Sequence, residues 1–191
     1  MKSKNKFIAI IGRSTAGKST IIRALTGIRG SRQPERIRDR STMKWIGVIS
    51  RSPQEQPIPS KQLRKEMRAA AIGARSLGMV IALQPTHPTT RLSIEEVFEM
   101  SERFAFERHV FVISKSYKGS RGTDPEVIRE RLIKFDFEKP VQPLDARRFA
   151  HINASVIRDI VGWFWLPRHP TASRRLPLKP LRLRKVHTSD F

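Results

Sequence analysis

The chain begins with an apolar run that leads directly into a glycine-spaced loop. Residues 7–11 are Phe-Ile-Ala-Ile-Ile, and residues 12–19 follow with the spacing Gly-x-x-x-x-Gly-Lys-Ser. Residues 21–27 then show the apolar periodicity of a helix and end in glycine. In a strand–loop–helix unit of this kind, backbone N–H groups of the loop point inward and bind phosphate oxygens, assisted by the positive end of the helix. The sequence therefore predicts a phosphate-binding loop at the start of an α/β fold.

The loop pattern also predicts roles for individual residues. Lys18 is expected to reach the β- and γ-phosphates of a nucleotide, and the Ser19 hydroxyl is expected to ligate Mg²⁺. Thr20 is expected to support the α-phosphate. The predicted phosphate cradle comprises Gly12, Ser14, Thr15, Ala16, Gly17, Lys18, Ser19 and Thr20.

Length, cysteine content and the first residues narrow the class of protein. The 191 residues suit one domain with a sizeable core. The sequence has no cysteine, which excludes disulfides, thiolate metal sites and cysteine nucleophiles, and its five histidines lack metal-ligand spacing. The basic residues 1–6 precede only a short apolar run, so neither a signal peptide nor a membrane span is predicted, and we expect a cytoplasmic protein.

The chain is strongly basic. It has 38 Lys and Arg residues against 17 Asp and Glu, which gives a formal net charge of +21. A phosphate-binding loop alone does not require this excess. A polyanionic partner explains it best, with RNA, the ribosome or DNA ahead of an acidic membrane surface, and a general solubility role is the alternative.

Apolar runs and helical patterns alternate along the rest of the chain. Further strands are predicted at 45–50, 79–83, 109–113 and 150–154, and helices at 60–76, 93–108, 123–135 and 155–165. Ser60 is the predicted N-cap of the first of these helices, and Ser93 with Glu96 forms a predicted capping box for the second. Strands that are apolar throughout and alternate with helices predict a three-layer α/β/α fold around a mainly parallel five-stranded sheet.

Polar residues follow each predicted strand, at the edge where open α/β sheets bind their ligands. Besides Gly12, these are residues 52–55, 84–87, 114–117 and 153–155. The strand at 45–50 ends without an aspartate, and the first carboxylate after it is Glu55. Either Ser19, the phosphates and water hold the metal without a carboxylate, or Glu55 supplies the carboxylate that an aspartate at the end of the strand would provide. For a hydrolysing protein, Gln54 or Glu55 is the candidate to orient the attacking water.

Residues 12–19 and the order of elements over roughly residues 6–165 resemble P-loop NTPases, in particular small GTPase domains of the translation-factor and ribosome-assembly type. The resemblance implies binding of GTP or ATP with Mg²⁺ and a hydrolysing switch. It also implies base contacts from Lys115 and Asn153. The metal-strand motif Asp-x-x-Gly is not present at 50–55, and of the guanine-reading motif Asn-Lys-x-Asp only Lys115 is present. The segment before Trp45 is too short for that class's antiparallel edge strand, so none is predicted.

Two other functions remain open. Residues 121–132 resemble the lid segment of nucleoside-monophosphate kinases, which implies lid arginines at 121, 129 and 131 and an acceptor site at residues 28–42. The alternative for Arg129 and Arg131 is a solvated helix face. The other function is that of a nucleotide-binding module that does not hydrolyse.

The arginine-rich segment 28–42 and the end of the chain are predicted to be loops or tails. Within the first, candidates for phosphate contacts are Arg36, Arg38, Arg40, Ser41 and Thr42, with a solvated linker as the alternative. Residues 1–166 are predicted to form the nucleotide-binding domain. Residues 167–191 carry seven Lys or Arg against one Asp, with recurrent prolines, and are predicted to form an extended basic tail.

Overall fold

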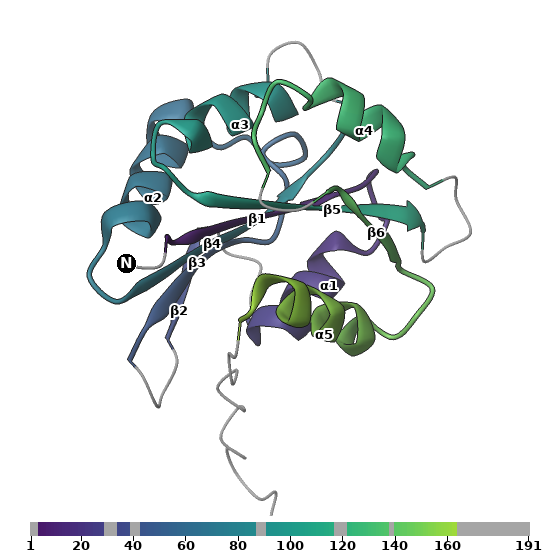
Figure 1. The fold of residues 1–191 in the computed structure, drawn as a ribbon, viewed down its shortest axis with the longest axis horizontal. Coiled ribbons are helices and arrows are strands. Elements are labelled where there is room, and N and C mark those ends of the chain that lie inside the picture. Colours follow the sequence, from purple (N-terminus) through teal and green to yellow (C-terminus); the bar gives the residue numbers. More distant parts are fainter. Residues whose placement is uncertain are drawn as a thin grey trace, which may run out of the picture.

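The computed structural model is an α/β domain whose described residues form a six-stranded sheet and five helices (Figure 1). It describes residues 4–28, 34–38, 43–86, 91–116, 122–137 and 140–163. The strands are β1 (Lys6–Ile11), β2 (Glu35–Arg38), β3 (Trp45–Ile49), β4 (Ser76–Leu83), β5 (Glu107–Lys115) and β6 (Gln142–Asp145). The helices are α1 (Lys18–Thr26), α2 (Ser60–Ile72), α3 (Ile94–Glu102), α4 (Pro125–Arg131) and α5 (Ala150–Val161).

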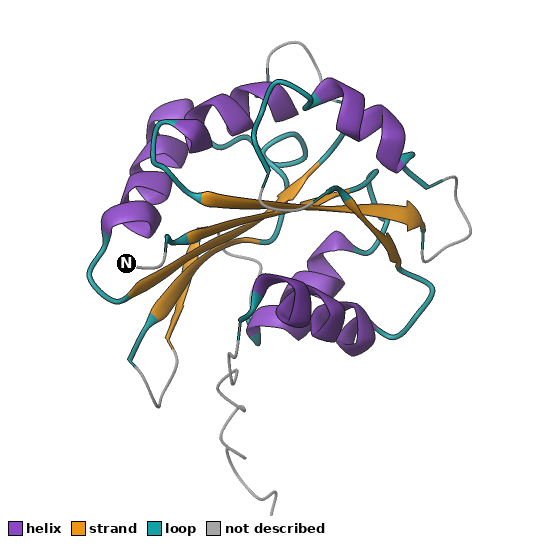
Figure 2. Cartoon of the chain, in the orientation of Figure 1, coloured by secondary structure: helices purple, strands orange, loops and turns teal. Residues whose placement is uncertain are grey.

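The strand order is β2-β3-β4-β1-β5-β6, and every neighbouring pair except β2 with β3 is parallel. From β1 the chain runs out to β2 at one edge of the sheet, comes back through β3 and β4, and then passes β1 to reach β5 and β6. Because crossovers between parallel strands are right-handed, those that move toward one edge of the sheet place their helices on one face. Those that move toward the other edge place their helices on the opposite face. Accordingly, α1 and α5 cover one face, whereas α2, α3 and α4 cover the other (Figures 1 and 2).

Strand β1 lies at the centre of the sheet and of the core. Its last five residues, 7–11, are fully buried. Because side chains alternate along a strand, Phe7, Ala9 and Ile11 belong to the hydrophobic cluster beneath α2, α3 and α4. Ile8 and Ile10 belong to the cluster beneath α1 and α5. The loop that follows β1 is thus anchored to a strand that is covered from both sides.

Several predicted elements are confirmed. The runs at 7–11, 79–83 and 109–113 are strands, and the run at 45–50 is a strand as far as Ile49. Helix α3 begins with the predicted capping box between Ser93 and Glu96. The predicted N-cap at Ser60 is wrong, because Ser60 is already helical and Pro59 holds the N-cap position. The helices predicted at 60–76, 93–108 and 123–135 end earlier, at Ile72, Glu102 and Arg131.

The predicted strand count of five is wrong, and both missed strands lie at the edges. In β2, which is antiparallel to β3, Ile37 packs on the core while the arginines on either side are exposed. One apolar side chain is sufficient for an edge strand but leaves no apolar run in the sequence. In β6, Pro143 interrupts the strand pattern, and proline is tolerated at a sheet edge. The strand predicted at 150–154 instead forms the first turns of α5.

No helix in the described parts of the chain is long and apolar enough to cross a membrane.

Gly78 is predicted to be essential for the pairing of β4 with β1. Its φ is +122°, and a Cβ added there would lie 1.9 Å from the Lys6 carbonyl oxygen. Gly78→Ala should therefore lower the free energy of unfolding by about 2 kcal/mol or more. Gly162→Ala is the matched control, because Gly162 also has a positive φ, of +67°, but has no heavy atom within 4 Å of an added Cβ. Urea unfolding of both variants tests this, and equal losses would contradict it.

Candidate functional site

The loop between β1 and α1 is shaped by its backbone. The Gly12 N–H donates to the Leu83 carbonyl at 3.1 Å, which joins the end of β1 to the end of β4, and the Ala16 N–H donates to the Arg13 carbonyl. Gly17 has a φ of 103°, a left-handed conformation that favours glycine. Gly17 is also the N-cap of α1 and offers no capping side chain, so the first N–H groups of α1 face the loop without a side-chain acceptor.

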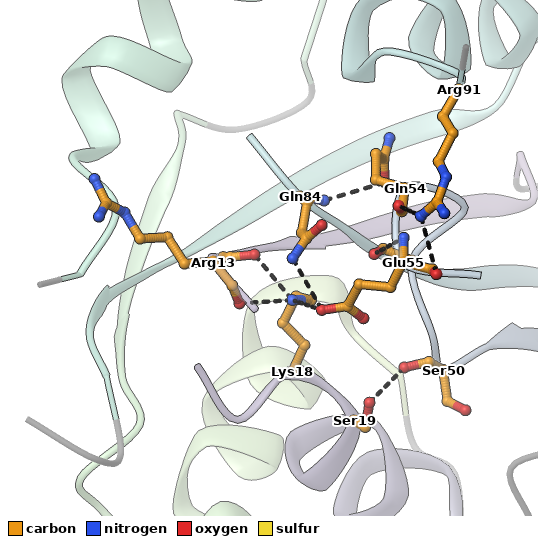
Figure 3. Close-up of polar contacts among 10 residues, drawn as sticks. Arg13, Lys18, Ser19, Ser50, Gln54, Glu55, Gln84 and Arg91 are labelled. Carbon is orange, nitrogen blue, oxygen red and sulfur yellow. Dashed lines mark hydrogen bonds and ion pairs between the residues drawn. The ribbon is translucent and has the colours of Figure 1, made fainter. Parts of the chain in front are cut away.

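Lys18 lies at the base of this loop, only 4% exposed. Its ammonium donates to the carbonyls of Gly12 at 2.9 Å and Arg13 at 2.7 Å (Figure 3). It also lies 3.3 Å from the Glu55 carboxylate. Burial lowers the pKa of the Lys18 ammonium, and the Glu55 carboxylate opposes that shift. The loop thus holds a cation at its centre.

The Glu55 carboxylate faces the loop from the segment after β3. Besides Lys18, it accepts a hydrogen bond from Gln84 Nε2 at 3.0 Å. The segment itself is fixed by a turn in which the Glu55 N–H donates to the Ser52 carbonyl, and by Arg91, which donates to the carbonyls of Gln54 and Glu55 (Figure 3). Glu55 is therefore held beside the loop although its strand is not adjacent to β1.

Gln54 occupies a different environment from Glu55. It is 1% exposed, its Nε2 donates to the Leu92 carbonyl at 2.8 Å, and its Oε1 accepts from the Gln84 N–H at 3.2 Å. Both ends of the amide are thus bonded to backbone. Gln54 joins the loop after β3 to the loop after β4. It is not among the residues that line the hollow at the loop, which are residues 15–20 and Glu55.

Ser19 and Glu55 are the groups near Lys18 that suit a divalent cation. The Ser19 hydroxyl donates to the Ser50 carbonyl at 2.6 Å, which leaves its oxygen lone pairs available as a ligand. A hydroxyl and one carboxylate match the oxygen ligands with which Mg²⁺ is bound beside substrate phosphates. Within the described ranges there is no group of three or more His, Asp or Glu that could hold a metal.

The sequence placed Gln84 at the binding edge of the sheet but gave it no role in the site. The sequence predicted the metal-binding position after the strand at 45–50. In the sheet, however, β4 lies between that strand and β1. The residue that directly follows β4, beside the loop, is Gln84. The order of strands in the sheet cannot be predicted from a single sequence when the strands are similarly apolar. The amide of Gln84 contacts Glu55, and the carboxylate near the loop comes from the more distant strand β3.

Two neighbouring hollows share lining residues of the loop and of α1. The first, of about 170 Å³, is lined by residues 15–20 and Glu55 and forms the candidate phosphate cradle. The second, of about 620 Å³, shares Thr15, Gly17 and Thr20 with the first and extends to residues 146–150 after β6. Phe149 lines it with an exposure of 74%, and its ring stacks on His151 with centroids 5.6 Å apart. An exposed aromatic ring thus lines the hollow next to the candidate phosphate cradle.

The wall made by residues 146–149 is anchored by Asp145. The Asp145 carboxylate accepts two hydrogen bonds from the Arg147 guanidinium, at 3.0 and 2.8 Å, and lies 4.0 Å from the Lys115 ammonium. These hydrogen bonds from Arg147 are the main cause that lowers the pKa of Asp145 to about 2. The Ala146 N–H donates to the Lys115 carbonyl at 2.8 Å, which continues the pairing of β5 with β6.

The predicted base contacts lie outside this hollow. Lys115 is largely exposed beside Asp145. Asn153 is not in a loop but is buried in α5, where its side-chain amide donates to the Asp145 carbonyl at 2.9 Å. The loop that sequence reasoning missed is 146–149, and its signal was the polar segment directly after Leu144. That Phe149 is exposed could not be read from the sequence.

The remaining candidates are placed as follows. Ser14 is exposed on the loop, and Arg36 lies on β2, paired with Glu66 at 3.0 Å and placed over the Trp45 ring, so it does not reach the cradle. Arg129 is paired with Glu126 on an exposed helix face, whereas Arg131 donates to Glu95 and to the Pro85 carbonyl. The residues Arg40, Ser41, Thr42 and Arg121 and the tail at 167–191 lie outside the described residues.

Comparison with protein-family models gives no match, and comparison with curated proteins gives none either.

Proposed function

We propose that this chain is a P-loop protein that binds a purine nucleoside triphosphate, GTP or ATP, together with Mg²⁺. The observation that carries the proposal is the buried Lys18 ammonium inside a strand–loop–helix turn with the spacing of residues 12–19. A fixed cation beside a helix N-terminus that has no side-chain cap is the kind of anion site that matches a phosphate chain. The six-stranded α/β sheet, with the loop at the carboxyl edge of its central strand, is compatible with that assignment.

The nucleoside is proposed to occupy the larger hollow next to the cradle. Because the two hollows share Thr15, Gly17 and Thr20, a ligand with its phosphates over Lys18 would extend its ring system toward Phe149. One face of Phe149 already stacks on His151. The ring therefore offers a supported aromatic surface on which a purine could stack.

Ser19 and Glu55 are proposed to hold the cation and the attacking water. The Ser19 hydroxyl and the Glu55 carboxylate supply oxygen ligands, and the bound Mg²⁺ would neutralise phosphate charge. Glu55, rather than Gln54, is the proposed residue that orients water, because its carboxylate lines the cradle while the Gln54 amide is bonded to backbone. In this proposal the protein is a nucleotide-hydrolysing switch.

Lys18→Ala is expected to weaken nucleotide binding about 100-fold, which corresponds to roughly 3 kcal/mol, because it removes the charge-assisted contacts to the phosphates. Fluorescent GTP and ATP analogues, titrated side by side, measure the loss and show which purine is preferred. Lys134→Ala serves as control, since Lys134 pairs with Glu99 on an exposed surface. Undiminished affinity in folded Lys18→Ala would refute the central proposal.

Phe149→Ala is expected to lower nucleotide affinity about two- to tenfold, the range of an aromatic stacking contact. Binding of inorganic tripolyphosphate, which has no ring, should stay unchanged. Ile152→Ala is the matched control, because Ile152 is also exposed near the start of α5 but does not line the hollow. If Phe149→Ala weakens both ligands equally, the nucleoside lies elsewhere.

Glu55→Gln keeps a side-chain oxygen that can ligate Mg²⁺, so it is expected to retain nucleotide binding. It is expected to lose about 100-fold in hydrolysis rate, because an amide cannot accept a proton from the attacking water. Gln54→Ala should instead lower stability by about 1 to 3 kcal/mol, since it removes two buried hydrogen bonds, while the folded fraction keeps its turnover. Phosphate release and thermal unfolding separate these effects. The reverse assignment would follow if only Gln54→Ala lost turnover.

The same assays separate the two alternatives. A kinase would form nucleoside diphosphate only when an acceptor is added, and a non-hydrolysing module would bind nucleotide without turnover in the wild-type chain.

A further inference from the structure

Charge is segregated between two helices that cover the same face of the sheet. Helix α3 carries four glutamates, and three of them are paired with cations from other elements of the domain. Glu95 pairs with Arg131 at 2.8 Å and Glu99 with Lys134 at 2.8 Å. Glu102 lies 3.6 Å from Arg108. The acidic helix is therefore largely neutralised by its own domain.

Helix α2 differs, because its outward cations have no partner among the residues that the structure describes. The exposed cations are Lys61, Arg64, Lys65 and Arg68. Within the described ranges, none of them forms an ion pair or a side-chain hydrogen bond. The one acid of the helix, Glu66, already accepts from Arg36 on β2 at 3.0 Å. The described part of the domain thus leaves this charge uncompensated.

The four cations form one continuous face. They stand at positions i, i+3, i+4 and i+7, which share a side of an α-helix, and the seven-residue span covers about 10 Å. The opposite side of α2 buries Leu63, Met67 and Ala70 in the core beneath it. Because packing fixes the helix on its buried side, the basic side faces away from the sheet. Helix α2 itself lies on the outside of the domain, at the left of Figure 1.

The chemistry of this face favours a phosphodiester backbone over other polyanions. A helix that lies on a membrane inserts its apolar side into the lipid, but here that side is buried against the sheet. Protein interfaces usually centre on aromatic or apolar anchors, and the only large apolar side chain on the outer surface of α2 is Ile72 at its last residue. Regularly spaced cations without such anchors match a row of phosphates.

We infer that the outer face of α2 is a nucleic-acid-binding surface that contacts the phosphate backbone through Lys61, Arg64, Lys65 and Arg68. This inference goes beyond the proposed nucleotide function and does not depend on it. Backbone contacts of this kind give affinity without base specificity and make it strongly dependent on salt.

The test is a full-length quadruple variant, Lys61→Gln, Arg64→Gln, Lys65→Gln and Arg68→Gln, titrated with labelled 24-nucleotide RNA and DNA of the same sequence. Glutamine has a helix propensity close to that of lysine and arginine, so α2 should remain folded. We expect affinity at moderate salt to fall at least tenfold for both strands. The slope of log affinity against log salt should fall by about three to four, roughly one for each cation that no longer neutralises a phosphate.

The matched control neutralises four exposed cations elsewhere, with Arg51→Gln, Arg103→Gln, Arg129→Gln and Lys134→Gln. It has the same net charge as the α2 variant and should keep most of the affinity and slope. Equal losses in both variants would show a general charge effect and overturn the inference, as would unchanged binding in the α2 variant. Vesicles with anionic lipid form the third arm, and α2-dependent binding to vesicles without binding to RNA or DNA would also overturn it. Nucleotide titration of the α2 variant reports on the proposed function separately.

Discussion

The candidate site depends on the hydrogen bonds and the ion pair of the buried Lys18 ammonium. A charge removed from water is costly unless it is paired and hydrogen-bonded. Its three partners come from two places, because Gly12 and Arg13 follow β1 whereas Glu55 follows β3. The same contacts that satisfy Lys18 therefore close the loop and draw a carboxylate toward it. The contacts that satisfy Lys18 thus also shape the proposed phosphate cradle around its ammonium group.

The sheet topology explains why that carboxylate needs additional support. Since β4 lies between β1 and β3, the segment that carries Glu55 has to cross the end of β4 to reach Lys18. Gln84 contacts Glu55 at that crossing, and Gln54 and Arg91 fasten the two loops to each other. The polar network after β3 and β4 is thus a consequence of where the strands lie.

The net charge of this protein is a property of its composition, whereas the positions of the charged side chains depend on the fold. The net charge of +21 indicates a polyanionic partner but not its location. The fold pairs most of the acids of α3 with neighbouring cations and leaves the cations of α2 facing outward. Of the basic residues in the described chain, those of α2 are the ones for which spacing, exposure and the lack of partners coincide.

The sequence alone determined the elements whose signals are local. The apolar run at 7–11, the glycine spacing of 12–19 and the capping box at Ser93 fix a buried strand, a tight loop and a helix start through the conformations of neighbouring residues. Tertiary structure decided the rest, because it depends on contacts between distant segments. It made edge strands of β2 and β6, where one-sided burial or a proline hides the pattern, and it turned 150–154 into helix. It also placed Gln84 beside the loop, buried the amide of Gln54, and exposed Phe149 next to the cradle. Strand order and exposure are properties of the packed chain, and no single stretch of residues encodes them.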